Sequence, residues 1–461
     1  MTATQKSSAP MSWGGHINAS ILLGLPLVGS HVAQMLTHIT DVVMLGWYQV
    51  EALAGVVLAS QLYFIVFIVG SGFAFAIMPM CATALGAEND RQVRRSVRMG
   101  AWLVTLYGVL FAVPLWFLEP ILLALGQQPD LAQIAQDYMR IAVLGLFPSL
   151  WIMVLKSYLS ALERAQIVLI ATLVAAAANI VFNYAFIFGN LGFPEMGAKG
   201  AAWASVLTIT LDFVFLLVYC RVLPALKKYE LFQNPFRFDR EAFVETFKLG
   251  WPISLTLLAE TTLFSAATIM VGWSGTIALA AHGIVLQITS VGFMIPLGIS
   301  NVGTIRGGRA LGRKDKLHLK RAAAVVMWGA FAVSLVSLTL YLTVPEFLMR
   351  LFVDPSEPNL DAIVEIGVLL LLVSAAFQIV DAMQVAALGL LRGIKDTTVP
   401  MILAVFSYWI VGMPSAYILG FPLGYGAQGV WGGLVIGLTV AAITMIWRYL
   451  KLQRNLDFSA A

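Results

Sequence analysis

GLPLVGSHVAQMLTHITDVVMLGW, residues 24–47, has a diverged second copy in the same 461-residue chain. Residues 250–273 read GWPISLTLLAETTLFSAATIMVGW, and the two stretches align without a gap at a shift of 226 residues. Both copies open with Gly-x-Pro and close with Gly-Trp. Each is apolar enough and long enough to form a membrane-spanning helix. A repeat of this kind indicates a chain built by duplication.

The repeat extends beyond this helix, and its matches keep their order along the chain. Pairs at the same shift are Ala52–Ala54 with Ala278–Ala280, Gln61 with Gln287, and Ala84–Gly86 with Ala310–Gly312. After an insertion of two or three residues, further pairs are Phe193–Pro194 with Phe421–Pro422 and Gly197–Gly200 with Gly426–Gly429. An ordered series indicates one structural unit present in two copies.

The composition is that of an all-α polytopic membrane protein. The chain is 60% hydrophobic and only 11% charged, whereas a soluble domain carries about 25% charged residues. Apolar runs of about 20 residues recur along the sequence. We predict twelve transmembrane helices, near 17–46, 53–82, 99–118, 137–161, 167–188, 200–220, 247–272, 277–302, 322–344, 362–391, 398–419 and 429–447.

Six spans fall in each half, so both halves insert in the same orientation and form a parallel repeat about an axis along the membrane normal. We therefore predict two six-helix lobes, residues 1–225 and 247–461, facing each other across a central cleft. The polar stretch 226–246 would link them on the cytoplasmic side. Two facing lobes are the arrangement that an alternating-access carrier needs, and we expect such a carrier to act as a monomer.

Basic residues alternate between the predicted loops. Loops around 91–98, 221–240 and 306–321 are basic, whereas loops on the opposite side carry acids such as Glu119 and Asp130. The positive-inside rule places the basic loops and both termini in the cytoplasm. Topology accounts for the formal net charge of +4, so we expect membrane lipid and no nucleic acid as a partner.

Three carboxylates are each isolated in a long apolar run. Asp41 is the only acid or base between Lys6 and Glu51, apart from histidine. Glu260 is isolated in the same way within the second copy of the repeat, and Asp381 within the predicted span 362–391. A charge in a bilayer core is costly, so such residues face water or the bundle interior and mark ion pathways.

The two copies place their acids differently. Glu260 corresponds to Gln34 at the shift of 226 residues, whereas Asp41 corresponds to Ala267. Asp41 lies seven residues beyond Gln34, which is about 10 Å along a helix. The two lobes are therefore chemically unequal, and two different ion sites are expected.

Polar residues accompany Asp41. Asn179 and Asn183 stand at i and i+4 on one face of a predicted helix. Their amides can hydrogen-bond a carboxylate or supply oxygens to Na⁺, or else bond helices together. His38, one turn before Asp41, is a candidate proton relay or a packing histidine.

In the second half, Gln378 and Gln384 flank Asp381 at i−3 and i+3. Together Glu260 and Asp381 would form a two-carboxylate site for a cation such as Na⁺, or bind a proton. Asp212 is a weaker secondary candidate, because neither the repeat nor a polar neighbour supports it.

Pro26 and Pro252 occupy equivalent positions in the repeat and are expected to interrupt their helices, as hinges or as fixed kinks. Nothing in the sequence indicates an enzyme: it has no GxSxG, HExxH, CxxC or phosphate-loop motif. We expect no cofactor beyond a coupling ion, Na⁺ or H⁺.

Five motifs together carry a resemblance to a known family. They are the GLP…VAQ…D run of Gly24–Asp41, ANIVFNYAFIFG of Ala178–Gly189, GFPEMGAKGAA of Gly192–Ala202, AET of Ala259–Thr261 and LRGIKDTTVPM of Leu391–Met401. The chain resembles the multidrug and toxic compound extrusion (MATE) family over roughly residues 15–450, and its NorM branch in particular.

The resemblance implies that Asp41, with Asn179 and Asn183, serves proton coupling, and that Glu260 and Asp381 bind a cation. It also implies a bacterial inner membrane protein. His38 and Asp212 match no site of that family.

We therefore expect a secondary antiporter that exports small cationic, amphipathic compounds in exchange for Na⁺ or H⁺. The alternatives are a lipid-linked oligosaccharide flippase of the same superfamily and a non-transporting receptor or assembly protein. The flippase would need basic residues in its spans to bind a pyrophosphate, and the predicted spans hold almost none.

Overall fold

The computed structural model describes residues 11–48, 50–354 and 357–456, and over these ranges the protein is an all-helical membrane protein. Twelve segments in this part of the chain are long and apolar enough to cross a membrane. They match the twelve predicted spans one to one, which confirms the predicted architecture. The chain ends, 1–10 and 457–461, lie outside the described residues.

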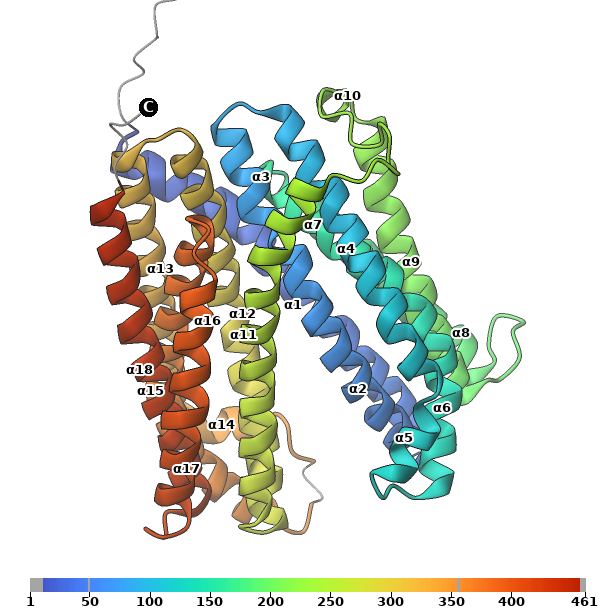
Figure 1. Cartoon of the computed structure of the whole chain (residues 1–461). Coiled ribbons are helices and arrows are strands. Elements are labelled where there is room, and N and C mark those ends of the chain that lie inside the picture. Colours follow the sequence, from blue (N-terminus) through green and yellow to red (C-terminus); the bar gives the residue numbers. More distant parts are fainter. Residues whose placement is uncertain (1–10, 49, 355–356, 457–461) are drawn as a thin grey trace, which may run out of the picture.

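The first lobe consists of the first six spans and their connections (Figure 1). Its elements are α1 (Trp13–Tyr48), α2 (Val50–Phe75), α3 (Ile77–Gly86), α4 (Asp90–Trp116), α5 (Leu118–Ala124), α6 (Pro129–Ala142), η1 (Val143–Gly145), α7 (Leu146–Ala161), α8 (Ala165–Phe188), α9 (Gly197–Val222) and α10 (Pro224–Lys227).

The second lobe consists of the other six spans. Its elements are α11 (Arg240–Gly272), α12 (Thr276–Gly312), α13 (Lys316–Thr343), α14 (Pro345–Arg350), α15 (Leu360–Gly393), α16 (Thr398–Val405), η2 (Phe406–Gly412), α17 (Met413–Gly420) and α18 (Gly426–Asn455). Helix α11 begins at Arg240 and not near 247 as predicted, because the Asp239 side chain caps it by accepting a hydrogen bond from the Ala242 N–H at 3.2 Å. The non-helical part of the linker is correspondingly short.

Prolines explain where three spans depart from a regular α-helix. Proline has no N–H to donate to the carbonyl four residues earlier. Pro79 thus separates α2 from α3, and Pro148 follows the 3₁₀ turn η1. Pro414 follows η2, a stretch of π-helix. By contrast, α1 runs through Pro26 and α11 through Pro252 as continuous helices. That these two prolines act as hinges or fixed kinks stays a prediction.

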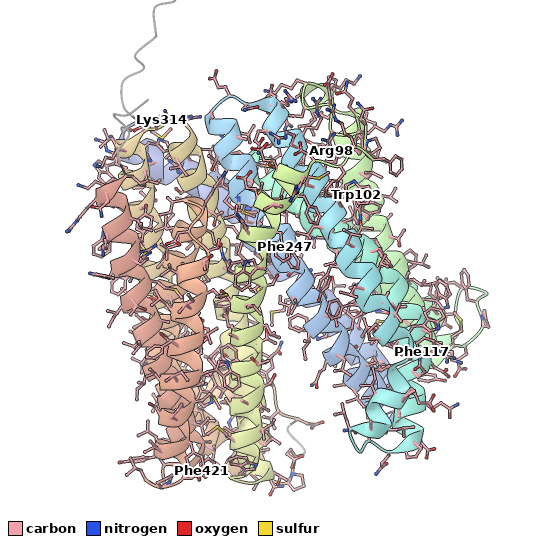
Figure 2. All side chains as sticks on the ribbon, viewed as in Figure 1. Arg98, Trp102, Phe117, Phe247, Lys314 and Phe421 are labelled. Atoms are coloured by element: carbon pink, nitrogen blue, oxygen red, sulfur yellow. The ribbon has the colours of Figure 1, made fainter. Side chains whose placement is uncertain are left out.

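The two lobes meet at the end of the molecule that carries the linker and diverge toward the opposite end (Figure 1). Figure 2 shows Phe247 where the lobes meet; its ring is stacked on that of Phe73 of the first lobe, with 5.9 Å between the ring centroids. Phe117 and Phe421 lie on separate lobes at the far end. The hydrogen bonds between lobes that we find among the described residues lie in the linker half. One joins Ser254 Oγ to the Val69 carbonyl at 2.6 Å.

Glycines let the lobe backbones approach closely, and they do so in repeat-related pairs. A methyl group built on Gly86 would lie 2.3 Å from the Arg309 carbonyl oxygen, and one on Gly312 would lie 2.1 Å from the Thr83 carbonyl oxygen. Because 83 corresponds to 309 and 86 to 312, the same contact is made twice, in opposite directions. This reciprocity is what a two-fold axis between the lobes produces.

Candidate functional site

The Asp41 carboxylate on α1 is held by three side chains of the first lobe. Its Oδ1 accepts hydrogen bonds from Nδ2 of Asn179 at 2.9 Å and Nδ2 of Asn183 at 2.6 Å. Ser205 Oγ of α9 donates to Oδ2 at 3.3 Å. The structure thus brings together the three residues that the sequence placed near one another. Binding of a proton or cation there stays a prediction.

The two asparagines form a buried pair one turn apart on α8. Asn183 Nδ2 also donates to Asn179 Oδ1 at 3.1 Å, and both side chains are fully buried. Asn183 Oδ1 has no hydrogen-bond partner among the described residues. Buried oxygen atoms in proteins normally accept a hydrogen bond. The Asn183 Oδ1 accepts none, so it is available as a ligand beside the Asp41 carboxylate.

Gln34 and His38 lie on α1 outside this network. Both side chains are exposed, and His38 lies one turn before Asp41. Ser205 was missed by the sequence analysis, since a single serine in an apolar run carries no local signal.

A second polar cluster lies inside the second lobe. Asp381 on α15 is only 3% exposed, and its Oδ1 has no hydrogen-bond partner among the described residues. Gln378 and Gln384, on the same helix, are fully buried; both amide atoms of Gln378 and the Gln384 Oε1 also lack partners. Gln384 Nε2 is 3.7 Å from the Met445 sulfur. Leaving several buried polar atoms unpaired is costly, so this cluster is arranged for something other than packing.

The π-helix η2 adds to this cluster. The hydroxyls of Ser407 and Tyr408 are buried and unpartnered within the described chain. The Trp409 indole N–H donates to the Ala259 carbonyl at 3.3 Å, which fixes η2 against α11 at the residue before Glu260. Short π-helical segments occur frequently at functional sites, where they redirect side chains. No sequence signal predicted this segment or Tyr408.

Glu260 is half-buried on α11, and its charge interacts with those of Asp381 and Arg392. Arg392 is 8% exposed, and its Nε and Nη2 atoms have no hydrogen-bond partner in the described chain. The described residues contain no group of three or more His, Cys, Asp or Glu side chains able to hold a metal. Two carboxylates with neutral amide and hydroxyl oxygens are instead a donor set for a proton or a hard monovalent cation.

The structure places Asp212 in a buried ion pair with Lys156, and within the described chain neither residue hydrogen-bonds to a member of the two clusters described above. Lys156 Nζ lies 3.2 Å from Asp212 Oδ2 and donates to Thr172 Oγ1 at 3.1 Å. The pair uses Asp212 Oδ2, whereas Oδ1 has no hydrogen-bond partner among the described residues. The nearby ammonium group balances the charge of the carboxylate without a transported ion.

The two polar clusters are separate, because each is built within one lobe. The first uses α1, α8 and α9, and the second uses α11, α15 and η2. The geometry is therefore one polar cluster per lobe, with unequal chemistry.

The MatE family model matches residues 26–185 and again residues 252–418. The two matches start 226 residues apart, at Pro26 and Pro252, which is the shift of the internal repeat. The chain belongs to the MatE family.

Similar proteins agree with this assignment. A protein of Rhizobium meliloti named "Probable multidrug resistance protein NorM" is 45% identical over the whole chain and 99% of its own length. A protein of the same name from Agrobacterium fabrum is 43% identical over 96% of both chains.

Among solved structures, "MATE in complex with MaL6" has a TM-score of 0.87 at 22% identity and covers 95% of this chain and 98% of its own. The eukaryotic MATE transporter AtDTX14 has a TM-score of 0.86 at 18% identity and covers 97% of both chains. These likenesses show a shared fold.

Proposed function

We propose that this MatE protein is a secondary multidrug efflux antiporter that exports small cationic, amphipathic compounds in exchange for Na⁺ or H⁺. The observation that carries the proposal is the set of buried, unpartnered polar atoms around Glu260 and Asp381. An acid without a partner in a membrane interior binds a proton or a cation more readily than one already paired. The names of the relatives support drugs as the cargo.

In the proposed cycle, the linker end faces the cytoplasm of a bacterial inner membrane and both chain termini lie on that side. The lobe contacts described above then correspond to a state closed toward the cytoplasm. A cation entering from outside binds Glu260 and Asp381, or a proton binds Asp41, and displaces the bound drug. The lobes then rock to open the cytoplasmic side, where the ion leaves and drug binds again. Each ligand moves the equilibrium only through its different affinity for the two states.

We propose Pro26 and Pro252 as the flexible points of this motion. Each lies within a continuous helix that lacks one backbone hydrogen bond at the proline, so bending there breaks fewer bonds than elsewhere. Because each ion site is complete within one lobe of a single chain, the transporter is proposed to act as a monomer.

Ethidium transport in membrane vesicles, under an imposed Na⁺ or proton gradient, tests the proposal. We expect one gradient to drive transport, and Glu260→Gln or Asp41→Asn to reduce it strongly. The control is Glu365→Gln, which removes an exposed carboxylate from the same helix as Asp381. If neither gradient drives transport, the antiporter proposal fails; if both site variants transport normally, the site assignment fails.

A further inference from the structure

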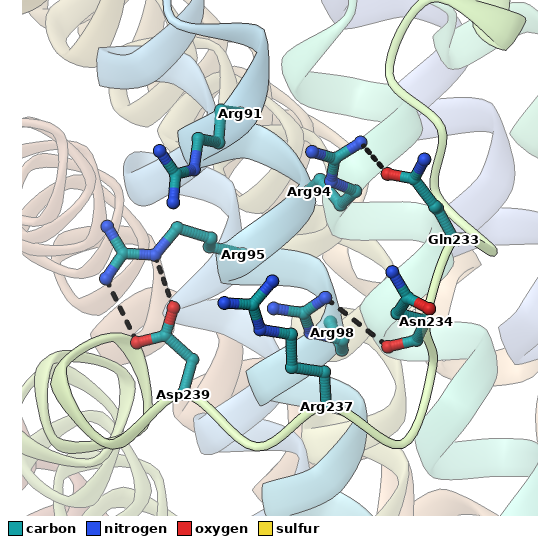
Figure 3. A pocket seen from close by; sticks show the side chains of 8 residues that line it. All are labelled: Arg91, Arg94, Arg95, Arg98, Gln233, Asn234, Arg237 and Asp239. Atoms are coloured by element: carbon teal, nitrogen blue, oxygen red, sulfur yellow. Dashed lines mark hydrogen bonds and ion pairs between the residues drawn. The ribbon is translucent and has the colours of Figure 1, made fainter.

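A cluster of five arginines surrounds a small cavity on the linker side of the first lobe (Figure 3). Arg91, Arg94, Arg95 and Arg98 come from the first turns of α4, and Arg237 comes from the linker loop. The cavity has a volume of about 60 Å³. It is too small for a drug-sized molecule, which needs about 300 Å³ or more, and is suited to a compact charged group.

Two of these arginines are paired with carboxylates. Arg95 makes two contacts with Asp239, Nε to Oδ2 at 2.5 Å and Nη2 to Oδ1 at 3.0 Å, and a third with Glu241 at 2.6 Å. These hydrogen bonds lower the pKa of Asp239 to about 2. Its carboxylate therefore stays charged at neutral pH and engages Arg95. Arg94 pairs with Glu230.

The other three guanidinium groups have no acidic partner. Arg91 and Arg237 form no ion pair or hydrogen bond through their side chains in the described chain, and both are exposed. Arg98 Nη1 donates a hydrogen bond to the Asn234 carbonyl at 3.4 Å, and its Nε is buried without a partner among the described residues. Like charges repel, so three unpaired guanidinium groups around one cavity favour an anion between them.

The linker loop that closes the cavity also presents aromatic side chains. Phe236 is 85% exposed and Phe238 is 53% exposed, on either side of Arg237. The loop is held against α4 by the Trp102 indole N–H, which donates to the Pro235 carbonyl at 3.1 Å. Figure 2 shows Arg98 and Trp102 one turn apart on α4, where the charged end of this span meets its apolar part. Exposed aromatic residues beside basic ones are typical of the boundary between lipid and water.

We propose that this cavity binds the phosphodiester headgroup of an anionic phospholipid, with Arg91, Arg98 and Arg237 around the phosphate. The acyl chains would pack on Phe236 and along α4. Basic pockets at the cytoplasmic ends of membrane helices bind such headgroups. Because Arg237 lies in the loop that joins the lobes, a bound lipid would tie that loop to the first lobe. This proposal depends on the membrane topology and not on the identity of the transported compound.

The experiment measures binding of phosphatidylglycerol to the purified full-length protein in detergent, by thermal unfolding and native mass spectrometry. The test variant is Arg91→Gln with Arg237→Gln, because neither side chain forms a hydrogen bond or ion pair within the described residues, so the fold should persist. We expect the concentration of phosphatidylglycerol for half-saturation to rise roughly 30-fold, since each charge near an anionic lipid contributes about fivefold. Added salt should weaken binding to the wild type.

The matched control is Arg221→Gln with Lys227→Gln, which removes two exposed charges on the same side but outside the cavity. Neither side chain forms an ion pair within the part of the chain that the structure describes. It should bind phosphatidylglycerol like the wild type. Phosphatidylcholine should give no comparable stabilisation. Equal loss of binding in the control variant, or none in the test variant, would overturn the proposal. Stabilisation by potassium phosphate or glycerol 1-phosphate, at ionic strength matched with potassium chloride, would assign the cavity to a free anion and overturn the lipid assignment.

Discussion

Asp41 of the first lobe accepts hydrogen bonds at both of its oxygens, whereas Asp381 of the second lobe has an oxygen without a donor among the described residues. Asp41 accepts three hydrogen bonds from Asn179, Asn183 and Ser205. Asp381 is buried with an oxygen that has no donor in the described chain, beside glutamine and tyrosine groups in the same condition. One repeated scaffold therefore holds a carboxylate whose two oxygens both accept hydrogen bonds, and a second cluster in which several buried polar atoms have no partner in the described chain.

The difference teaches that a duplicated fold need not duplicate its chemistry. A carboxylate that already accepts three hydrogen bonds gains less from binding an ion than buried polar atoms that have no partner. For the proposed antiporter, we therefore expect the coupling ion to contribute most of its binding free energy in the second lobe.

The largest expected effect comes from neutralising the second-lobe acids. Asp381→Asn should lower ion-driven transport about a hundredfold, near the upper end of usual coupling between sites. It should also abolish stabilisation of the protein by the coupling ion, because the charge that attracts the ion is gone. Thermal unfolding with and without Na⁺, and at several pH values, together with vesicle transport, measures both.

The same substitution in the first lobe, Asp41→Asn, supplies the contrast. It removes a carboxylate that accepts three hydrogen bonds, so it should lower thermal stability, while Asp381→Asn should leave stability unchanged or raise it. Equal unfolding temperatures for the two variants would contradict the difference in hydrogen bonding that we describe between the two lobes.

The next effect concerns Asp212, the paired acid of the first lobe. Lys156→Met strands the Asp212 carboxylate and should lower the free energy of unfolding by about 3 to 5 kcal/mol. The double variant Lys156→Met with Asp212→Leu removes both charges and should recover most of the loss. Unfolding of the three proteins in detergent checks this. A single variant as stable as the double one would show that the ion pair does not stabilise the first lobe.

A smaller effect is expected from Asn183→Leu, which removes the shortest hydrogen bond to Asp41. A bond to a charged group contributes about 1.5 to 3 kcal/mol, so a loss of about 2 kcal/mol in unfolding free energy is expected. Ser205→Ala, at the longer distance of 3.3 Å, should lose less. The reverse order in thermal unfolding would contradict the assignment of Asp41 as a charged acceptor.

The smallest effect is expected from Tyr408→Phe. The substitution keeps the ring and deletes a buried hydroxyl that has no partner, so stability should stay level or rise by about 1 kcal/mol. Affinity for the coupling ion should fall several-fold if the hydroxyl oxygen is a ligand. Titration of the ion, followed by intrinsic fluorescence or calorimetry, separates this outcome from a purely structural role, in which affinity would not move.

The twelve spans and the relation between the lobes could be predicted because they depend on run length and on a repeat visible in the sequence. The contact of Asp41 with Asn179 and Asn183 could be predicted for a similar reason. An isolated acid needs hydrogen-bond donors, and amides four residues apart lie on one face of a helix. The boundaries of individual helices were harder to predict. Asp239 followed by Glu241 is a helix-start signal that places α11 at Arg240, but the polar character of the linker obscured it.

The remainder of the site depends on tertiary packing. Tyr408 reaches the second-lobe cluster because η2 widens into a π-helix, and Trp409 fixes that segment to the Ala259 carbonyl. Neither event follows from local residue preferences. Ser205 completes the Asp41 site only because α9 packs beside α1 and α8. The basic loops were predicted as a topological signal, but their convergence on one cavity required the linker loop to fold back on α4.

The reciprocal contact in which Gly86 meets Arg309 and Gly312 meets Thr83 has the form of an isologous subunit interface. In a dimer of identical subunits, every substitution on one side is imposed on the other. Joining the two subunits in one chain removes that constraint while keeping the interface. The first copy can then hold Gln34 where the second holds Glu260. Fusion thus permits a symmetric fold to carry two chemically different polar clusters, one on each side of its own axis.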